Sequence, residues 1–374
     1  MEHHRGSHRQ LIDTSPATAP PARGHVDAII VPTVRTPGCL SHAMRLAGRL
    51  RCPLVSLHSR WWSRADLAAD LMPEGTPYLA IDLGEQRLLN LPDLRTTALL
   101  RSTRFERTTD IGAKRNLGLL LATLLGWERV VFLDDDVEVD APGDLVRAAA
   151  LLDRYDAVGL RLGGFPDNSV VCHAHRLTGG HQESFVGGGA LAVETFRNPS
   201  FFPGVYNEDW FYLLEERSLR SLAVTGTARQ HPYDPFDRPA RARDQELGDV
   251  LAEGVYWLLD DHGGADWTAA ADPAYWRRFL LRRSSFLLDV LRRAGRLPAG
   301  VRSRAMEASV RAALGRLRTI EAELCVRYVE AWQQDRRGWV EHLKRHSRLA
   351  WNVPDALTRL TRPGAPALTW RSSL

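Results

Sequence analysis

The chain has 374 residues, of which 44% are hydrophobic and 25% are charged, so it can bury a sizeable core and is not a disordered protein. Its longest apolar run, 117–127, falls well short of the roughly 20 residues that a membrane span needs. The net charge is +4, but Lys114 and Lys344 are the only lysines. Because arginine replaces lysine throughout, the positive balance is weak evidence for a nucleic-acid partner.

Charge divides the chain near residue 270. Residues 271–374 carry 21 basic and 9 acidic side chains, and residues 1–270 carry 28 and 36. We therefore expect a flexible tail (1–24), an acidic α/β domain (25–270), a basic helical region (271–352) and a second flexible tail (353–374). The acidic α/β part argues against nucleic-acid binding. Four scattered cysteines without a CxxC pair are typical of a reducing cytoplasm, so we expect a cytoplasmic protein.

Apolar strands and helical segments alternate at the start of the α/β domain. Strands are predicted near 26–35, 52–59 and 78–83, with helices near 40–50 and 65–72. This alternation predicts βαβ units, that is, a mainly parallel sheet flanked by helices. Ligands bind beyond the carboxyl ends of such strands, which directs attention to Thr33, Arg35, Ser56, Asp82 and the segment after Phe132.

Asp110 is placed to cap a helix over 111–125 that ends at Gly126. Lys114 and Arg115 fall in its first turn. A helix N-terminus with two cations is a favourable anion site, so these residues are candidates for phosphate contacts. The alternative is a pair of solvated surface cations.

The next strand, 129–133, runs into Asp134, Asp135 and Asp136. Three adjacent carboxylates repel one another unless a cation is present, and Mg²⁺ or Mn²⁺ is commonly held by one or two carboxylates together with substrate phosphates. If the strand geometry persists, Asp134 and Asp136 point to one side and Asp135 to the other. The alternative is a polar turn after a buried strand.

These segments, in this order, resemble the GT-A (Rossmann-like) fold of nucleotide-sugar-dependent glycosyltransferases, most closely the family 2 group. The resemblance covers about residues 25–235. It rests on the strand tip with Pro32, Thr33 and Arg35, on GAKRNLG (112–118), on the Asp-x-Asp (DXD) strand VVFLDDDVEV (130–139), on GGGALAV (187–193) and on NEDW (207–210).

The resemblance implies a transferase that moves a sugar from a nucleotide-diphosphate sugar to an acceptor hydroxyl. Asp209, or Glu208, would be the base, and Mn²⁺ or Mg²⁺ would bridge the diphosphate. The implied donor-binding residues are Pro32, Thr33, Arg35, Asp82, Lys114, Arg115, Asn116, Asp134 and Asp135; the acceptor-side residues are Gly187, Gly188, Gly189 and Trp210; the metal ligands are Asp136, Asp134 and His231. For His231 the alternative is an ordinary surface-loop histidine.

Several features remain open at this stage. His173 and His175 would share a face of a strand, with His181 nearby. These histidines would be solvated, would belong to an acceptor-facing loop or would bind a zinc ion. The C-terminal helices would pack on the core or on a second subunit; contact with a membrane surface is the alternative. The acceptor, whether small molecule, glycan or lipid-linked, is not specified. A nucleotidyltransferase using a nucleoside triphosphate and Mg²⁺, or a non-catalytic nucleotide-sugar-binding protein, are the competing functions.

Overall fold

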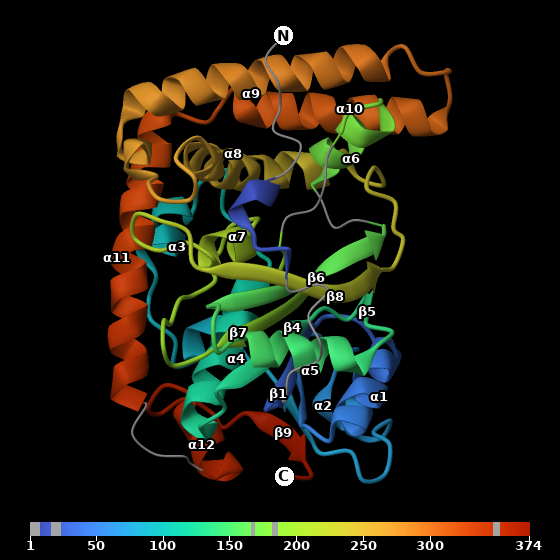
Figure 1. The fold of residues 1–374 in the computed structure, drawn as a ribbon, viewed down its shortest axis with the longest axis vertical. Helices are drawn as coiled ribbons and strands as arrows, with labels where there is room; N and C mark the ends of the chain where they lie inside the picture. Colours follow the sequence, from blue (N-terminus) through green and yellow to red (C-terminus); the bar gives the residue numbers. More distant parts are fainter. Residues whose placement is uncertain (1–7, 16–23, 166–168, 182–185, 347–351) are drawn as a thin grey trace.

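A computed structural model describes residues 8–15, 24–165, 169–181, 186–346 and 352–374. Within them the backbone forms one mixed sheet in the order β5-β8-β6-β7-β4-β1-β2-β3-β9 (Figure 1). The strands are β1 (Ala28–Thr33), β2 (Leu54–His58), β3 (Tyr78–Asp82), β4 (Arg129–Leu133), β5 (Val137–Glu138), β6 (Ala157–Gly164), β7 (Ala190–Glu194), β8 (Leu222–Gln230) and β9 (Thr369–Ser372).

The sheet is mainly parallel, as predicted. Of the strands described, β1, β2, β3, β4, β6 and β8 share one direction, and β5, β7 and β9 oppose it. All six residues of β1 and all five of β2 are buried, as is typical of parallel strands covered on both faces. Thr33 pairs with His58, which pairs with Asp82, so the carboxyl ends of β1, β2 and β3 are level.

Helices cover both faces of the sheet, which confirms the α/β class. One face packs on α1 (Ser41–Leu50), α2 (Ala65–Ala69) and α5 (Pro142–Leu151), and the other packs on α4 (Ile111–Leu125). The remaining helices are α3 (Arg95–Leu100), α6 (Val170–Leu177), α7 (Glu208–Tyr212), α8 (Pro239–Asp261), α9 (Pro273–Ala294), α10 (Val301–Leu317), α11 (Ala322–His346) and α12 (Val353–Arg359). Short 3₁₀ turns occupy η1 (Arg9–Leu11), η3 (Pro37–Leu40), η4 (Gln86–Leu88) and η5 (Thr268–Ala271).

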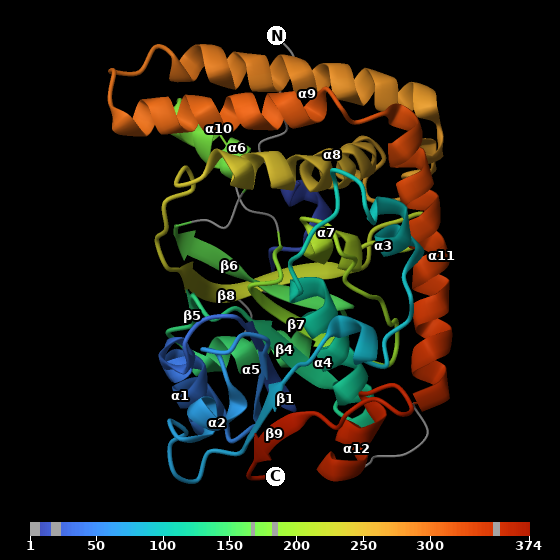
Figure 2. The ribbon, with the colours of Figure 1, turned by 180° about the vertical axis from the view of Figure 1, so that it is seen from behind.

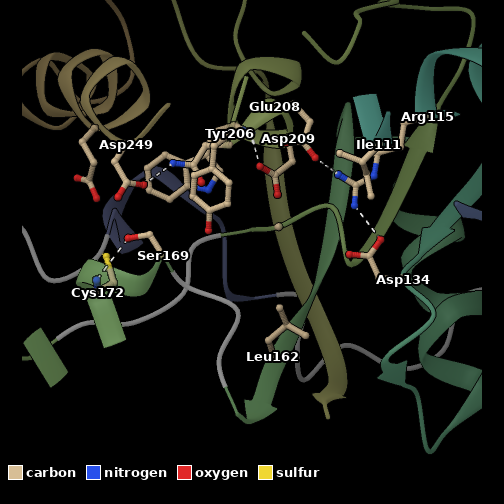
Figure 3. A pocket seen from close by; sticks show the side chains of 14 residues that line it. Ile111, Arg115, Asp134, Leu162, Ser169, Cys172, Tyr206, Glu208, Asp209 and Asp249 are labelled. Atoms are coloured by element: carbon tan, nitrogen blue, oxygen red, sulfur yellow. Dashed lines mark hydrogen bonds and ion pairs between the residues drawn. The ribbon is translucent and has the colours of Figure 1, made fainter. Parts of the chain in front are cut away.

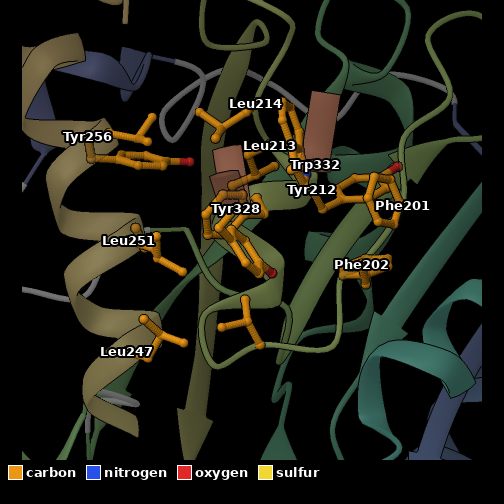
Figure 4. Close-up of a cluster of buried hydrophobic side chains, with 14 of the residues drawn as sticks. Phe201, Phe202, Tyr212, Leu213, Leu214, Leu247, Leu251, Tyr256, Tyr328 and Trp332 are labelled. Carbon is orange, nitrogen blue, oxygen red and sulfur yellow. The ribbon is translucent and has the colours of Figure 1, made fainter. Parts of the chain in front are cut away.

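The helical C-terminal region packs on the α/β core. In Figures 1 and 2, α9 and α10 lie across one end of the molecule beside α8, and α11 runs along its side. Figure 4 shows the contact with the core, where Trp332 and Tyr328 of α11 meet Phe201, Tyr212 and neighbouring side chains. Large apolar side chains of these helices, such as Trp276, Trp332 and Trp339, are therefore buried within the chain, whereas Leu281 and Leu288 of α9 are exposed. No helix in the described ranges is both long and apolar enough to cross a membrane.

Both expected tails contain ordered segments. In the first, residues 1–7 and 16–23 lie outside the described residues, but Asp13 hydrogen-bonds the backbone of Leu222 and Val224, and His8 is buried. In the second, α12 packs near α4 and β9 pairs with the edge strand β3. The prediction of a flexible 353–374 was therefore wrong. A strand of four residues with a half-exposed edge gives little pattern in the sequence.

Candidate active site

The three carboxylates after β4 separate because the strand ends at Leu133. The Asp134 amide still donates to the Gly189 carbonyl at 3.0 Å, but a turn follows in which the Val137 amide donates to the Asp134 carbonyl. The predicted alternation of side chains is consequently wrong. Asp134 faces α4, whereas Asp135 and Asp136 both approach Arg35 at the tip of β1, with N···O distances of 3.3 and 2.6 Å.

The β1 tip and this turn form one polar cluster. The Thr33 hydroxyl donates to Asp135 at 2.5 Å. Burial raises the pKa of both Asp135 and Asp136, Asp134 raises that of Asp136 further, and the Arg35 guanidinium opposes both shifts. Two partly buried carboxylates thus share a single cation whose own side chain is 46% exposed.

This donor set fits Mg²⁺ or Mn²⁺ bound together with a diphosphate. Such ions take one or two carboxylates plus phosphate oxygens and do not need a complete protein cage. No group of three or more His, Cys, Asp or Glu side chains among the described residues is arranged to hold a metal. The His231 ring lies 3.1 Å from Glu138, and its backbone amide donates to the Asp136 carbonyl. The backbone of the predicted ligand His231 is therefore next to Asp136, but its ring contacts the Glu138 carboxylate.

Lys114 lies beneath the β1 tip and is only 1% exposed. Its Nζ donates to the Thr33 carbonyl at 2.7 Å and lies 3.3 Å from Asp110, whose side chain makes no capping hydrogen bond. Burial lowers the pKa of Lys114. The lysine therefore supports the backbone of the candidate donor site from inside. Its burial rules out the alternative of a solvated surface cation for Lys114, and the phosphate contact stays a prediction.

Arg115 joins the carboxylates on the two sides of the site. Its guanidinium is buried and contacts Asp134 at 2.8 Å and Glu208 at 2.6 Å. Gly188 makes room for it, because a Cβ built there would lie 2.5 Å from Nη1. Arg115 thus links the turn after β4 to α7 and passes close to Gly188, for which the resemblance implies a position on the acceptor side.

Asn116 has a structural position. Its Nδ2 donates to the Phe202 carbonyl and its Oδ1 accepts from the Phe202 amide, both at 2.8 Å. Both ends of this amide therefore hold the loop before α7. A direct contact with a nucleotide, which the resemblance implies, is not what this geometry provides.

Asp209 projects from the first turn of α7. Its Oδ2 accepts the Gly188 amide at 2.7 Å, and burial raises its pKa. Burial also raises the pKa of the adjacent Glu208 to about 7, against the opposing effect of Arg115. Glu208 forms an ion pair with Arg115, whereas Asp209 accepts hydrogen bonds from the backbone amides of Gly188 and Trp210. Asp209 is therefore the better candidate for a base.

These side chains line a cavity of about 120 Å³ (Figure 3). Asp134 and Asp249 lie at opposite ends of the view, with Asp209 between them. The lining consists of Ile111, Arg115, Asp134, Leu162, Ser169, Cys172, Gly187, Tyr206, Asn207, Glu208, Asp209, Trp210, Asp249 and Glu253. The contribution of α8 was not predicted from the sequence. Its buried acids Glu246, Asp249 and Glu253 recur at helical spacing, which is the signal that could have revealed them.

The other predicted residues take varied positions. Pro32 is buried within β1. Asp82 accepts the Ala65 amide at 2.7 Å, two strands away from Thr33 in the sheet. A Cβ at Gly189 would lie 3.3 Å from Asp134, and Trp210 packs on Tyr256. Gly187, Gly188, Glu208, Asp209 and Trp210 are thus brought together, and Asp82 lies apart from them.

The histidines of 173–181 lie on and after α6, a helix that Ser169 caps; the strand predicted there was wrong. The His173 ring stacks on Phe165 and lies 3.2 Å from the Tyr233 hydroxyl. His175 instead contacts Arg293 at 2.7 Å. The two rings therefore serve separate packing contacts.

Comparisons with known proteins give distant structural likenesses. No family model matches the chain, and no curated protein matches its sequence. The mannosyltransferase PcManGT from Pyrobaculum calidifontis, solved with GDP-Man and Mn²⁺, is 14% identical with a TM-score of 0.41, covering 90% of this chain and 89% of that one. A candidate nucleotide-diphospho-sugar transferase from Desulfovibrio desulfuricans G20 is 14% identical with a TM-score of 0.29, covering 68% and 98%. Likenesses this distant establish neither a family nor an activity.

Proposed function

We propose that this protein is a metal-dependent glycosyltransferase that moves a sugar from a nucleotide-diphosphate sugar to an acceptor hydroxyl. The observation that carries the proposal is the position of Asp209. The Asp209 carboxylate is buried, has a raised pKa and lines the same cavity as Asp134. Asp134 begins the turn at the carboxyl end of β4, in which Asp135 and Asp136 pair with Arg35. Such strand ends are where α/β sheets bind nucleotides.

The donor half consists of the β1 tip and the turn after β4. Asp136, with Asp135 or Asp134, would hold Mn²⁺ or Mg²⁺, and a bound divalent ion would offset the charge on the departing diphosphate. Arg35 is half exposed and pairs with the same carboxylates, so its side chain can exchange them for a phosphate when the metal binds. Thr33, fixed from below by Lys114, keeps the tip in place.

The acceptor half is the cavity beside Asp209. Its carboxylate takes the proton of the acceptor hydroxyl while the new oxygen–carbon bond forms at the sugar C1 and the bond from C1 to the diphosphate oxygen breaks. Direct attack of this kind predicts inversion at C1. Since Asp209 must be ionised and burial raises its pKa, activity should fall on acidification at a pH above the usual range of an aspartate.

The test is a panel of UDP-, GDP-, ADP-, dTDP- and CDP-sugars with Mn²⁺ or Mg²⁺, scored by release of the free nucleoside diphosphate. We expect metal-dependent release from at least one donor, increased by a suitable acceptor. Release of pyrophosphate from a nucleoside triphosphate would instead identify a nucleotidyltransferase. Binding of a nucleoside diphosphate without turnover of any donor would identify a non-catalytic protein.

A further inference from the structure

The helical C-terminal region reaches the candidate base through one buried arginine. Arg283, on α9, is 3% exposed. Its Nε donates to Glu246 at 2.9 Å, and its Nη2 donates to Asp249 at 2.9 Å. Both carboxylates belong to α8, and Asp249 lines the cavity. Because the guanidinium is rigid and planar, it fixes the orientation of the Asp249 carboxylate.

Asp249 in turn holds the residue that precedes the catalytic pair. The Asn207 Nδ2 donates to Asp249 Oδ1 at 3.1 Å. Asn207 has φ 62° and ψ 36°, a left-handed conformation that asparagine tolerates better than most residues. Its carbonyl accepts the Trp210 amide at 3.1 Å, so the conformation of Asn207 sets how α7 begins.

The start of α7 determines where the Asp209 carboxylate lies. Asp209 comes two residues after Asn207, and its carboxylate accepts hydrogen bonds from the backbone amides of Gly188 and Trp210. A shift in the first turn of α7 would therefore move the carboxylate relative to Gly188. Displacements of about 1 Å in a catalytic group can cost about 100-fold in rate.

We propose that Arg283 is a positioning residue for Asp209, acting through Asp249 and Asn207, so that the C-terminal helices complete the catalytic site. The inference rests on the proposed function, because it assigns Asp209 the role of base. It explains why three carboxyl-bearing residues of α8 and an arginine of α9 are buried together beside the cavity. Simple attachment of one helix to another could use apolar contacts, which α9 also makes through Trp276, Phe286 and Leu287.

The sharpest variant is Asn207→Gly, because glycine accepts the left-handed conformation and removes only the amide link to Asp249. Arg283→Met removes the guanidinium, and Arg283→Lys is the conservative partner. The matched control is Asp335→Asn in α11. Asp335 also attaches the C-terminal helices to the core, by accepting the Arg95 and Thr96 amides and the Thr96 hydroxyl, at a place outside the cavity lining.

We expect Asn207→Gly and Arg283→Met to lower kcat by about 10- to 100-fold, with the donor KM changed by less than about 2-fold. Arg283→Lys should recover part of the loss, and Asp335→Asn should keep the parental kcat. If Asn207→Gly turns over like the parent, or if Asp335→Asn loses as much as the Arg283 variants, the positioning role is refuted while the proposed function stands.

A second readout needs no turnover and keeps the two failures distinct. The Gly188 amide is held by Asp209, so its hydrogen exchange reports the position of that carboxylate. Asn207→Gly and Arg283→Met should speed exchange at Gly188, and Asp335→Asn should not. If the parent protein turns over no donor, the proposed function fails. Unchanged exchange at Gly188 in both Asn207→Gly and Arg283→Met overturns the positioning role, whether or not the parent turns over a donor.

Discussion

Gly188→Ala tests whether the close approach of Arg115 to the 187–189 segment organises the site. A Cβ at residue 188 would lie 2.5, 2.6 and 2.8 Å from three atoms of the guanidinium. That group cannot simply swing away, because it is buried between Asp134 and Glu208. Overpacking typically costs about 1–3 kcal/mol, and breaking a buried ion pair costs about 3–5 kcal/mol. We therefore expect the free energy of unfolding to fall by about 2–4 kcal/mol.

Urea denaturation of Gly188→Ala measures this loss, and Gly187→Ala is the neighbouring control. A Cβ at residue 187 would have its nearest contact at 3.4 Å, an ordinary distance to Asp209 Oδ2. The control should stay within about 1 kcal/mol of the parent. Because the Gly188 amide also holds Asp209, Gly188→Ala should in addition lower kcat by about 100-fold. Equal stability and equal activity of the two variants would refute the reasoning.

Three further predictions follow from buried charges. Lys114→Met should lower the free energy of unfolding in urea by about 1–3 kcal/mol, since it leaves the buried Thr33 carbonyl without its donor; an unchanged value would contradict this. His8, whose pKa is raised to about 9 by Asp260 and Glu253 despite burial, contributes stability that is full below pH about 6.5 and is lost as pH rises through about 9. The stability difference between the parent and His8→Gln should thus shrink by about 3 kcal/mol across that window, and a pH-independent difference would count against it. Asp136→Ala should abolish the thermal stabilisation by Mn²⁺ plus a nucleoside diphosphate, measured by differential scanning fluorimetry; retention of that stabilisation would remove Asp136 from the metal site.

The α/β core was predictable because its signals are local. Buried parallel strands are apolar runs, and α4 begins after Asp110 and ends at Gly126, whose φ is 74°, as expected. Predictions that depended on contacts between distant segments failed, because local signals do not report such contacts. Alternation along a strand placed Asp134 with Asp136, but a turn begins at once after Leu133 and directs Asp135 and Asp136 to Arg35. Strand and helix propensities cannot report such a turn, which depends on the β1 tip.

Arg115, Asp134 and Asp209, which were singled out from the sequence, line one cavity, and their functional roles stay predictions. Lys114 and Asn116 do lie next to the site, but the Lys114 ammonium donates to the Thr33 carbonyl and the Asn116 amide bonds the backbone of Phe202. Tertiary packing decides which surface a charged side chain faces, and a sequence motif carries no information about that packing. The acceptor side was incomplete for the same reason. Asp249 lies 42 residues after Asn207 along the chain, and it meets the Asn207 amide and the cavity only when α8 is folded against α7.

The most direct test of the account compares the parent protein with Asp209→Asn in metal-dependent release of nucleotide from a nucleotide sugar in the presence of an acceptor. Asparagine keeps the size of the side chain and an oxygen for the Gly188 amide but cannot accept the proton. We predict that kcat falls by about 10²- to 10⁴-fold while the donor binds with unchanged affinity. Turnover by Asp209→Asn at the parental rate, or a parent protein that releases nucleotide from no donor, would contradict the central claim.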